Sequence, residues 1–350
     1  MANVIEYVKY YRNKSFQEVP FNEVDALIFA SLSYINFNGF MNKLPQSINE
    51  LATTFFNKMT PEKIKKTAKI HRDSCHLLNA MKDTIRYKDL LITDYQKVID
   101  KETQFGAITI RSKDWLYISF EGTNSYISGW KEDCHLSHRF PIPSQILARE
   151  YINRNVKLYD RTIYIGGHSK GANLAVAGSL KAYPSIRRRI SAIYDFDGPG
   201  LREKEFNTID YKIIEPKIKK YVPNHSLVGM LMYSKPDFKT INSNAKSILQ
   251  HNLFTWNCFG SFFVEDSLSR KSVKLSKEVK SFVSEYSEEE MEKFIESLFK
   301  VLKQANISQD DVITISKLAK CLTHIKDLKT DDKTKEKIAK LFNILIDFHK

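Results

Sequence analysis

Apolar side chains recur at helical spacing through residues 1–100. One face of a helix is formed by Val24, Leu27, Ile28 and Leu32. Residues three and four positions apart lie on the same side of a helix, and Asn22, just before this stripe, is a suitable N-cap. We therefore expect this first region to be mainly helical.

The pattern changes at Phe105 to β-branched and aromatic runs that are typical of strands. Residues 105–111 and 115–120 flank the polar segment 112–114, which predicts a hairpin. Further strands are predicted at 162–165, 190–197, 218–222 and 238–242, and helices at 144–154 and 172–182. Strands that alternate with helices predict a mostly parallel sheet with helices on its faces, an α/β fold.

Helical spacing returns in the last part of the chain, at 266–350. The apolar stripes are Met291, Phe294, Ile295, Leu298 and Leu302, and then Ile338, Leu341, Phe342 and Leu345. Ser287 to Glu290 has the spacing of a capping box, and Ser308-Gln309-Asp310-Asp311 predicts the start of a further helix. We expect an α/β domain over 1–265, with helical decoration at 1–100 and a sheet core at 101–265, followed by a helical segment at 266–350.

The composition is that of a water-soluble globular chain. Its 350 residues contain no apolar run of the ~18 residues that a membrane span needs, and Met1 to Tyr11 lacks the apolar stretch of a signal peptide. Four cysteines are scattered without paired spacing, so neither a disulfide framework nor a cysteine metal site is indicated. We expect a cytoplasmic protein with free thiols and without a metal or cofactor.

Positive charge is concentrated in the first 265 residues. The formal net charge is +13, and residues 266–350 hold 17 Lys or Arg against 15 Asp or Glu, which leaves an excess of 11 for the rest. Such a field attracts anionic lipid surfaces or acidic substrates, although solubility explains it equally well. No nucleic-acid-binding motif accompanies the charge. We expect peripheral contact with an anionic membrane to be compatible with this surface, and no binding of nucleic acid.

The segment Gly167-His168-Ser169-Lys170-Gly171 joins the strand at 162–165 to the small-residue helix at 172–182. A Gly-x-Ser-x-Gly motif on a strand-to-helix turn is the signature of a nucleophilic serine. The glycines let the turn be tight and allow the serine strained backbone angles. The sequence therefore predicts that Ser169 is a nucleophile.

A nucleophilic serine needs a base, which in this architecture comes later in the chain. His251 follows the last predicted strand and is favoured over His225. His324 and His349, in the terminal helices, are interpreted as structural or solvated, and His168 as a packing or site-lining residue.

The base in turn needs a carboxylate to hold its tautomer. Asp197 ends a strand just before an abrupt Gly-Pro-Gly turn, which presents its side chain at the carboxyl edge of the sheet. A turn-capping role is the alternative for Asp197. Asp195 lies further inside the strand, and Asp210 and Asp237 are weaker candidates.

Two backbone N–H groups are also required to bind the oxyanion of a tetrahedral intermediate. One is expected from Lys170, the residue after the nucleophile. The other is expected from the small turn at Gly122 and Thr123, after the strand that ends at Phe120. Without Ser169 this turn would be read as a plain loop.

Several of these segments together resemble a known family. The strand end Phe120 to Thr123, followed by Trp130 to Asp133, is similar to the oxyanion region of class-3 lipases. The chain more closely resembles the Mbeg-like group of bacterial α/β-hydrolases, a domain family of unknown function. The segments that match that group are 20–27, 167–171, 197–200, 222–229 and 250–256. The resemblance implies an α/β-hydrolase sheet and a triad of Ser169, His251 and Asp197.

Two positions depart from the lipase pattern. Lipases of that class take their acid from the segment that here reads Asn224-His225-Ser226, which has no carboxylate. Lys170 stands where these lipases usually have an apolar residue. Its charge would favour a substrate with an anionic head group, but a solvated side chain is the simpler expectation. The leading hypothesis is a serine hydrolase that cleaves a carboxylic ester of a small molecule or lipid. The alternative is an inactive α/β-hydrolase-fold binding or scaffold module.

Overall fold

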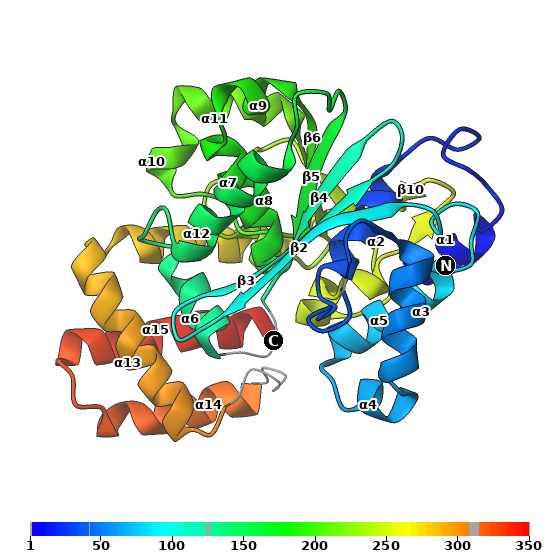
Figure 1. Cartoon of the computed structure of the whole chain (residues 1–350). Helices are drawn as coiled ribbons and strands as arrows, with labels where there is room; N and C mark the ends of the chain where they lie inside the picture. The colour runs from blue at the N-terminus through cyan, green and yellow to red at the C-terminus, as the bar shows by residue number, and fades with distance from the viewer. Residues whose placement is uncertain (1, 42, 124–126, 308–314, 350) are drawn as a thin grey trace.

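A twisted sheet of eight strands in sequential order, β1 to β8, forms the centre of the computed structural model (Figure 1). The structure describes residues 2–41, 43–123, 127–307 and 315–349. The strands of this sheet are β1 Gln46–Ser47, β2 Leu91–Ile99, β3 Gln104–Arg111, β4 Leu116–Phe120, β5 Ile163–His168, β6 Ile190–Phe196, β7 Ile218–Pro223 and β8 Lys239–Ile241. Strands β1 to β4 pair antiparallel and β4 to β8 pair parallel.

Helices surround the sheet and extend beyond it. The first group is α1 Val4–Tyr10, α2 Glu23–Leu32, α3 Ile48–Lys58, α4 Pro61–Lys65 and α5 Lys69–Met81. The second is α6 Ile127–His135, α7 Pro143–Asn155, α8 Lys170–Lys181, α9 Pro184–Arg189, α10 Glu203–Phe206 and α11 Ile209–Ile214. The third is α12 Arg270–Ser284, α13 Glu288–Gln304, α14 Ile315–His324 and α15 Asp332–His349. A small hairpin is formed by β9 Cys258–Phe259 and β10 Phe262–Phe263.

Different helices cover the two faces of the sheet. Successive side chains of a strand point to opposite sides, so each central strand contributes to two separate hydrophobic clusters. Leu116 and Ile118 of β4 join the buried cluster that includes α7 and α8. Tyr117 between them joins the cluster that includes α1, α2 and α5. Parallel strands buried on both faces are the reason that β4, β5 and β6 read as nearly continuous apolar runs.

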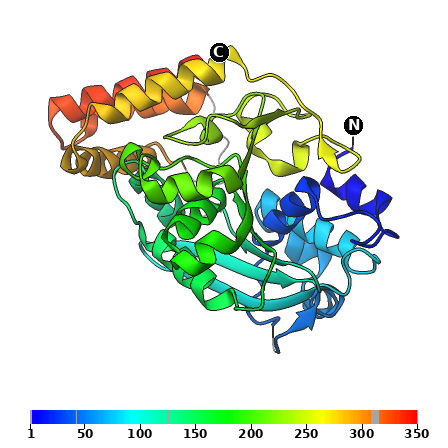
Figure 2. The ribbon, with the colours of Figure 1, turned by 90° about the horizontal axis from the view of Figure 1, so that it is seen from above.

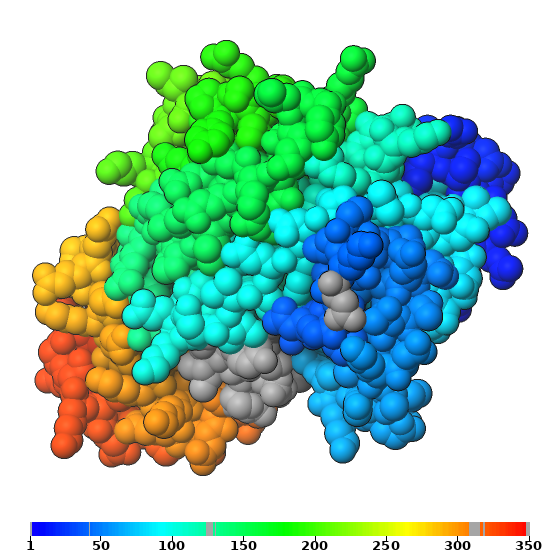
Figure 3. Space-filling model, in the orientation of Figure 1, coloured from blue at the N-terminus to red at the C-terminus, as the bar shows by residue number. Residues whose placement is uncertain are grey.

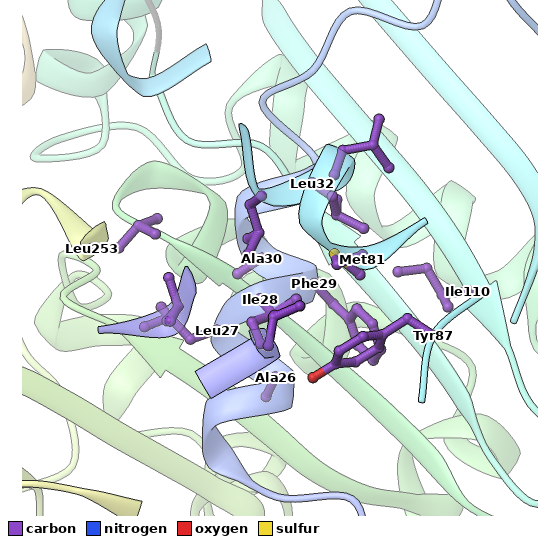
Figure 4. Close-up of a cluster of buried hydrophobic side chains, with 14 of the residues drawn as sticks. Ala26, Leu27, Ile28, Phe29, Ala30, Leu32, Met81, Tyr87, Ile110 and Leu253 are labelled. Atoms are coloured by element: carbon purple, nitrogen blue, oxygen red, sulfur yellow. The ribbon is translucent and has the colours of Figure 1, made fainter. Parts of the chain in front are cut away.

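Helix α2 is enclosed on all sides, and its residues from Val24 to Leu32 are buried. Figure 4 shows Leu27 on the side of Leu253 and Phe29 on the side of Tyr87. Asn22 accepts hydrogen bonds from the first turn and completes a capping box with Asp25. The predicted helix and its cap are therefore present, although the helix has a wider apolar surface than one stripe.

The expectation of a helical first 100 residues is wrong for β2. This nine-residue strand pairs antiparallel with β3 along its length, from Leu91 opposite Arg111 to Ile99 opposite Gln104. Its β-branched and aromatic residues favour a strand. Most of its side chains are only partly buried, so the strand lacks the continuous apolar run that marked the others. The short β1 was also not predicted.

The C-terminal helices form a hydrophobic cluster of their own, which includes Phe282, Phe294, Val301 and Phe342. They lie along one side of the molecule, away from the N-terminal helices (Figures 2 and 3). Ser287 caps α13 with the predicted capping box. The helix start predicted at 308–311 lies outside the described residues.

The sheet, with helices on both faces and a sharp turn between β5 and α8, is the arrangement of an α/β-hydrolase. This confirms the predicted fold class. All four cysteines are free thiols. Among the described residues, no helix has both the length and the hydropathy to cross a bilayer.

Candidate active site

Ser169 occupies the turn between β5 and α8 with a strained backbone, at φ 59° and ψ −131°. An L-residue rarely adopts a positive φ. The flanking glycines allow this turn, because a Cβ on Gly167 would lie 2.4 Å from the carbonyl of Gly171, and a Cβ on Gly171 would lie 2.2 Å from the carbonyl oxygen of Phe120. The two glycines of the motif are thus required by close backbone packing.

His251 and Asp197 lie beside this serine in a continuous chain of hydrogen bonds. His251 Nε2 is 3.0 Å from Ser169 Oγ, and His251 Nδ1 is 2.6 Å from Asp197 Oδ2. A carboxylate can only accept, so Nδ1 carries the proton and Nε2 is left as the acceptor for the serine hydroxyl. The structure therefore brings together the three residues that the sequence singled out for a triad.

Asp197 is fully buried at the end of β6 and also has a positive φ of 51°. Its second oxygen, Oδ1, accepts from Ser226 Oγ at 2.5 Å and from Gly229 N at 3.1 Å. Burial alone would raise the pKa of this carboxyl, but the hydrogen bonds from His251 and Ser226 and the charge of His251 outweigh burial and lower its pKa. Ser226 comes from the segment where class-3 lipases carry their acid, so that segment here supplies a hydroxyl that supports Asp197.

The neighbouring carboxylate, Asp195, is occupied elsewhere. Its Oδ2 lies 2.8 Å from Lys220 Nζ, and its Oδ1 accepts from Gly198 N at 2.9 Å. Asp210 pairs with Arg187 and Asp237 with Lys235. The structure thus places these three alternative acids in other interactions.

His168 lies between His251 and the N-terminal helices. Its Nε2 is 2.7 Å from the carbonyl oxygen of His251, and its Nδ1 is 2.7 Å from the hydroxyl of Tyr34. Burial, followed by the charge of His251, lowers the pKa of His168 to about 3, so the ring is neutral at pH 7. The neutral ring donates from Nε2 to the backbone carbonyl of His251 and accepts at Nδ1 from the Tyr34 hydroxyl. A buried ring beside His251 fits the interpretation of His168 as a packing or site-lining residue, whereas nothing in the sequence pattern indicated Tyr34.

Lys170 is not solvated, and this expectation is wrong. Its side chain is 1% exposed, with Nζ 2.5 Å from Glu132 Oε2 and 2.9 Å from the carbonyl oxygen of Gln104. Glu132 also accepts from the backbone N–H groups of Gln104 and Ser144. A buried lysine is stable when its charge is paired in this way. The Lys170 ammonium group is thus not available to bind an anionic head group of a substrate, the role that the sequence had suggested for it.

The predicted oxyanion turn lies beside the elbow. A Cβ on Gly122 would lie 2.0 Å from the Tyr34 hydroxyl oxygen, so only glycine fits. Thr123 Oγ1 donates to Asp133 Oδ2 at 2.5 Å. Burial of the Asp133 carboxyl raises its pKa to about 6, against the lowering effects of Lys170 and Thr123. The turn is therefore fixed by side chains on both sides.

Among the described residues, His225 contributes a backbone contact near the candidate triad, and His324 lies on a C-terminal helix. The backbone N–H of His225 donates to Gln250 Oε1, which steadies the segment before His251. His324 ends α14 and His349 ends α15, in the C-terminal helices. Among the described contacts of Ser169 and Asp197, the only imidazole that accepts or donates a hydrogen bond is that of His251.

Comparison with known proteins finds a matching family model and several similar solved structures. A family model described as Mbeg1-like matches residues 81–300. Among solved structures, the crystal structure of M37 lipase is similar, with 15% identical residues, a TM-score of 0.37, and 60% of this chain and 69% of that chain covered. No curated protein matches the sequence.

Proposed function

The chain belongs to the Mbeg1-like family, as its motifs predicted, and from the geometry of its candidate site we propose that it is a serine hydrolase of the lipase or esterase type. The observation that carries the proposal is the hydrogen-bonded chain from Ser169 Oγ through His251 to Asp197 Oδ2. This chain starts at a strained elbow serine, which is the geometry that nucleophilic serines require.

The proposed reaction has two steps that both use His251. In the first, His251 Nε2 takes the hydroxyl proton while Ser169 Oγ attacks the ester carbonyl carbon. Collapse of the tetrahedral intermediate then breaks the ester bond, and the same proton passes to the departing alcohol. In the second, His251 activates a water molecule that hydrolyses the acyl-Ser169 ester and releases a carboxylic acid. Asp197 stabilises the imidazolium in both steps.

The oxyanion donors that fit best are the backbone N–H groups of Lys170 and Thr123. Lys170 is the first residue of α8, where N–H groups lack intrahelical acceptors and the helix dipole favours negative charge. The backbone N–H of Gly122 is directed to Tyr34, which removes it from this role. Of the two residues considered in that turn, we therefore assign Thr123 as the donor.

The alternative of an inactive scaffold is less well supported. Loss of turnover in this fold is expected to leave the serine and base separated or the base without an acid. Here the distances are 3.0 Å and 2.6 Å, and Asp197 is present despite the absence of an acid at the lipase position. The proposed substrate is an acyl ester of a small molecule or lipid.

A fluorophosphonate probe tests the proposal, because it reacts covalently with activated serines. Wild-type protein should be labelled under native conditions, and Ser169→Ala should not be. Ser185→Ala is the matched control, since Ser185 is an exposed serine on α9, and it should be labelled as wild type. Absence of labelling of folded wild type, or equal labelling of Ser169→Ala, would contradict the proposal.

A further inference from the structure

A second group of chemically capable side chains lies outside the triad, where α13 meets the end of α6. His135 ends α6, His138 follows it, and Glu292 comes from α13. Glu292 Oε2 is 3.5 Å from His135 Nδ1 and 2.9 Å from His138 Nε2, and the donor atoms lie within 4.8 Å of one another. We propose that these three residues bind a divalent transition-metal ion, with zinc as the preferred one.

The ligand set and its spacing match zinc. Two imidazole nitrogens and one carboxylate oxygen are common ligands of Zn²⁺, at about 2.0–2.2 Å from the ion. Ligands at that distance in a tetrahedron are separated by about 3.3 Å, close to both separations from Glu292 Oε2. Nitrogen ligands also select transition metals over Mg²⁺ and Ca²⁺, which prefer oxygen.

The two ring nitrogens are suitably directed. His135 Nδ1 is buried and has no hydrogen-bond partner among the described residues, and the residue is 9% exposed. His138 is 7% exposed, and its other nitrogen, Nδ1, lies 3.4 Å from Ser137 Oγ. Because a carboxylate can only accept, Nε2 carries the proton toward Glu292 in the metal-free chain, and metal binding would release this proton while Nδ1 donates to Ser137 Oγ, as in metal sites whose ligands are oriented by a second hydrogen bond.

One cation already lies at this position. Arg139 Nη2 is 2.6 Å from Glu292 Oε2, and its side chain is 51% exposed. A guanidinium that is half in solvent can move out at little cost, because exposed ion pairs contribute only about 0–1 kcal/mol. A cavity of about 190 Å³, lined by His135, Arg139 and Glu292 among others, leaves space for a water molecule as the fourth ligand.

Metal binding here would connect the C-terminal helices to the flank of the candidate active site. Helix α6 also carries Glu132, the partner of Lys170, and Asp133, the partner of Thr123. Lys131 of α6 forms a further ion pair with Glu296 of α13. The proposal uses only the ligand geometry, so it stands independently of the proposed hydrolase activity.

Calorimetric titration of the full chain, freed of metal by a chelator, with Zn²⁺ provides the test. One equivalent should bind, Mg²⁺ should not, and the midpoint of thermal unfolding should rise with zinc concentration. Glu292→Gln and His135→Gln should each weaken zinc binding by about tenfold or more. His76→Gln, at an exposed histidine of α5, is the matched control and should bind as wild type.

Arg139→Gln distinguishes a metal site from a plain cluster of ion pairs, and it also covers the case in which a ligand variant fails to fold. Removal of the competing guanidinium should tighten zinc binding by several-fold, whereas a plain ion-pair cluster would show no zinc dependence in either protein. The proposal is overturned if wild type and Arg139→Gln both bind no stoichiometric zinc. It is also overturned if folded Glu292→Gln binds zinc as tightly as wild type.

Discussion

Two base–carboxylate pairs adjoin Ser169, one through the residue that follows it and one through the histidine at its hydroxyl, and they differ in their access to solvent. On one side, Lys170 Nζ is 2.5 Å from Glu132 Oε2, and both side chains are 1% exposed. On the other side, His251 Nδ1 is 2.6 Å from Asp197 Oδ2, and the imidazole is 27% exposed while the carboxyl is fully buried. The two pairs thus have similar distances and different surroundings.

The difference separates a positioning role from a chemical one. The Lys170 side chain is almost closed to solvent against Glu132 and the backbone of Gln104, so we infer that it positions the residue whose N–H we assign to the oxyanion hole. His251 has one nitrogen fixed by Asp197 and the other directed at Ser169. The partly exposed His251–Asp197 pair can therefore exchange a proton with a bound substrate, whereas the buried Lys170–Glu132 pair cannot.

The largest effect on activity should follow loss of the His251 imidazole. His251→Ala should lower the rate of hydrolysis of a model ester such as a p-nitrophenyl ester by on the order of 10⁴–10⁶-fold, because serine is a poor nucleophile without its base. The free energy of unfolding should change far less, since the ring is partly exposed. His225→Ala is the control and should keep its activity. Wild-type hydrolysis rates in His251→Ala would show that His251 is not the general base.

The second prediction compares the two aspartates at the end of β6. Asp197→Asn should lower the hydrolysis rate by about 10⁴-fold at neutral pH, because the amide no longer holds the productive tautomer of His251. Asp195→Asn should instead lower the free energy of unfolding, because Lys220 loses its buried partner. Both quantities are measured on both variants, by ester hydrolysis and by urea unfolding. If the two variants exchanged these outcomes, Asp195 would be the acid.

These aspartates also illustrate how much the sequence could predict. The elbow motif, the downstream His251 and the Asp197 turn are local signals at strand ends, where a parallel sheet brings carboxyl ends together. The strands β4 to β6 are predictable because burial on both faces gives each a nearly continuous apolar run. Strand β2 was missed because it is only partly buried.

Contacts between distant segments were the other class of information that the sequence pattern did not contain. Lys170 and Glu132 are separated by 38 residues, and Tyr34 and His168 by 134. From its residue type alone, Lys170 is expected to be solvated, because lysine is rarely buried unless it is paired. Only the tertiary fold shows that α6 supplies its carboxylate and that α2 leads to the tyrosine beside His168.

The third prediction concerns the buried ion pair of Lys170 and Glu132. Lys170→Met should lower the free energy of unfolding by about 3–5 kcal/mol, because Glu132 is left as an uncompensated buried charge. Lys170→Met combined with Glu132→Gln should recover part of this loss, because no unpaired charge remains. Chemical denaturation of wild type and the two variants measures the effect. A loss below about 1 kcal/mol for Lys170→Met, as exposed pairs show, would mean that the pair is open to water.

The smallest effect expected is a pH dependence of stability from His168. Burial lowers its pKa from 6.5 to about 3 in the folded chain, so the unfolded chain binds the proton more readily. Its stability contribution is intact above about pH 6.5 and is lost as the pH falls toward 3, by about 1.4 kcal/mol per pH unit. His168→Gln cannot titrate and should show a correspondingly shallower fall in urea unfolding between pH 6 and 4, while other titrating groups contribute equally to both proteins. Parallel pH curves would mean that His168 takes up its proton in the folded chain as readily as in the unfolded chain, and a protonated ring could not both donate to His251 and accept from Tyr34.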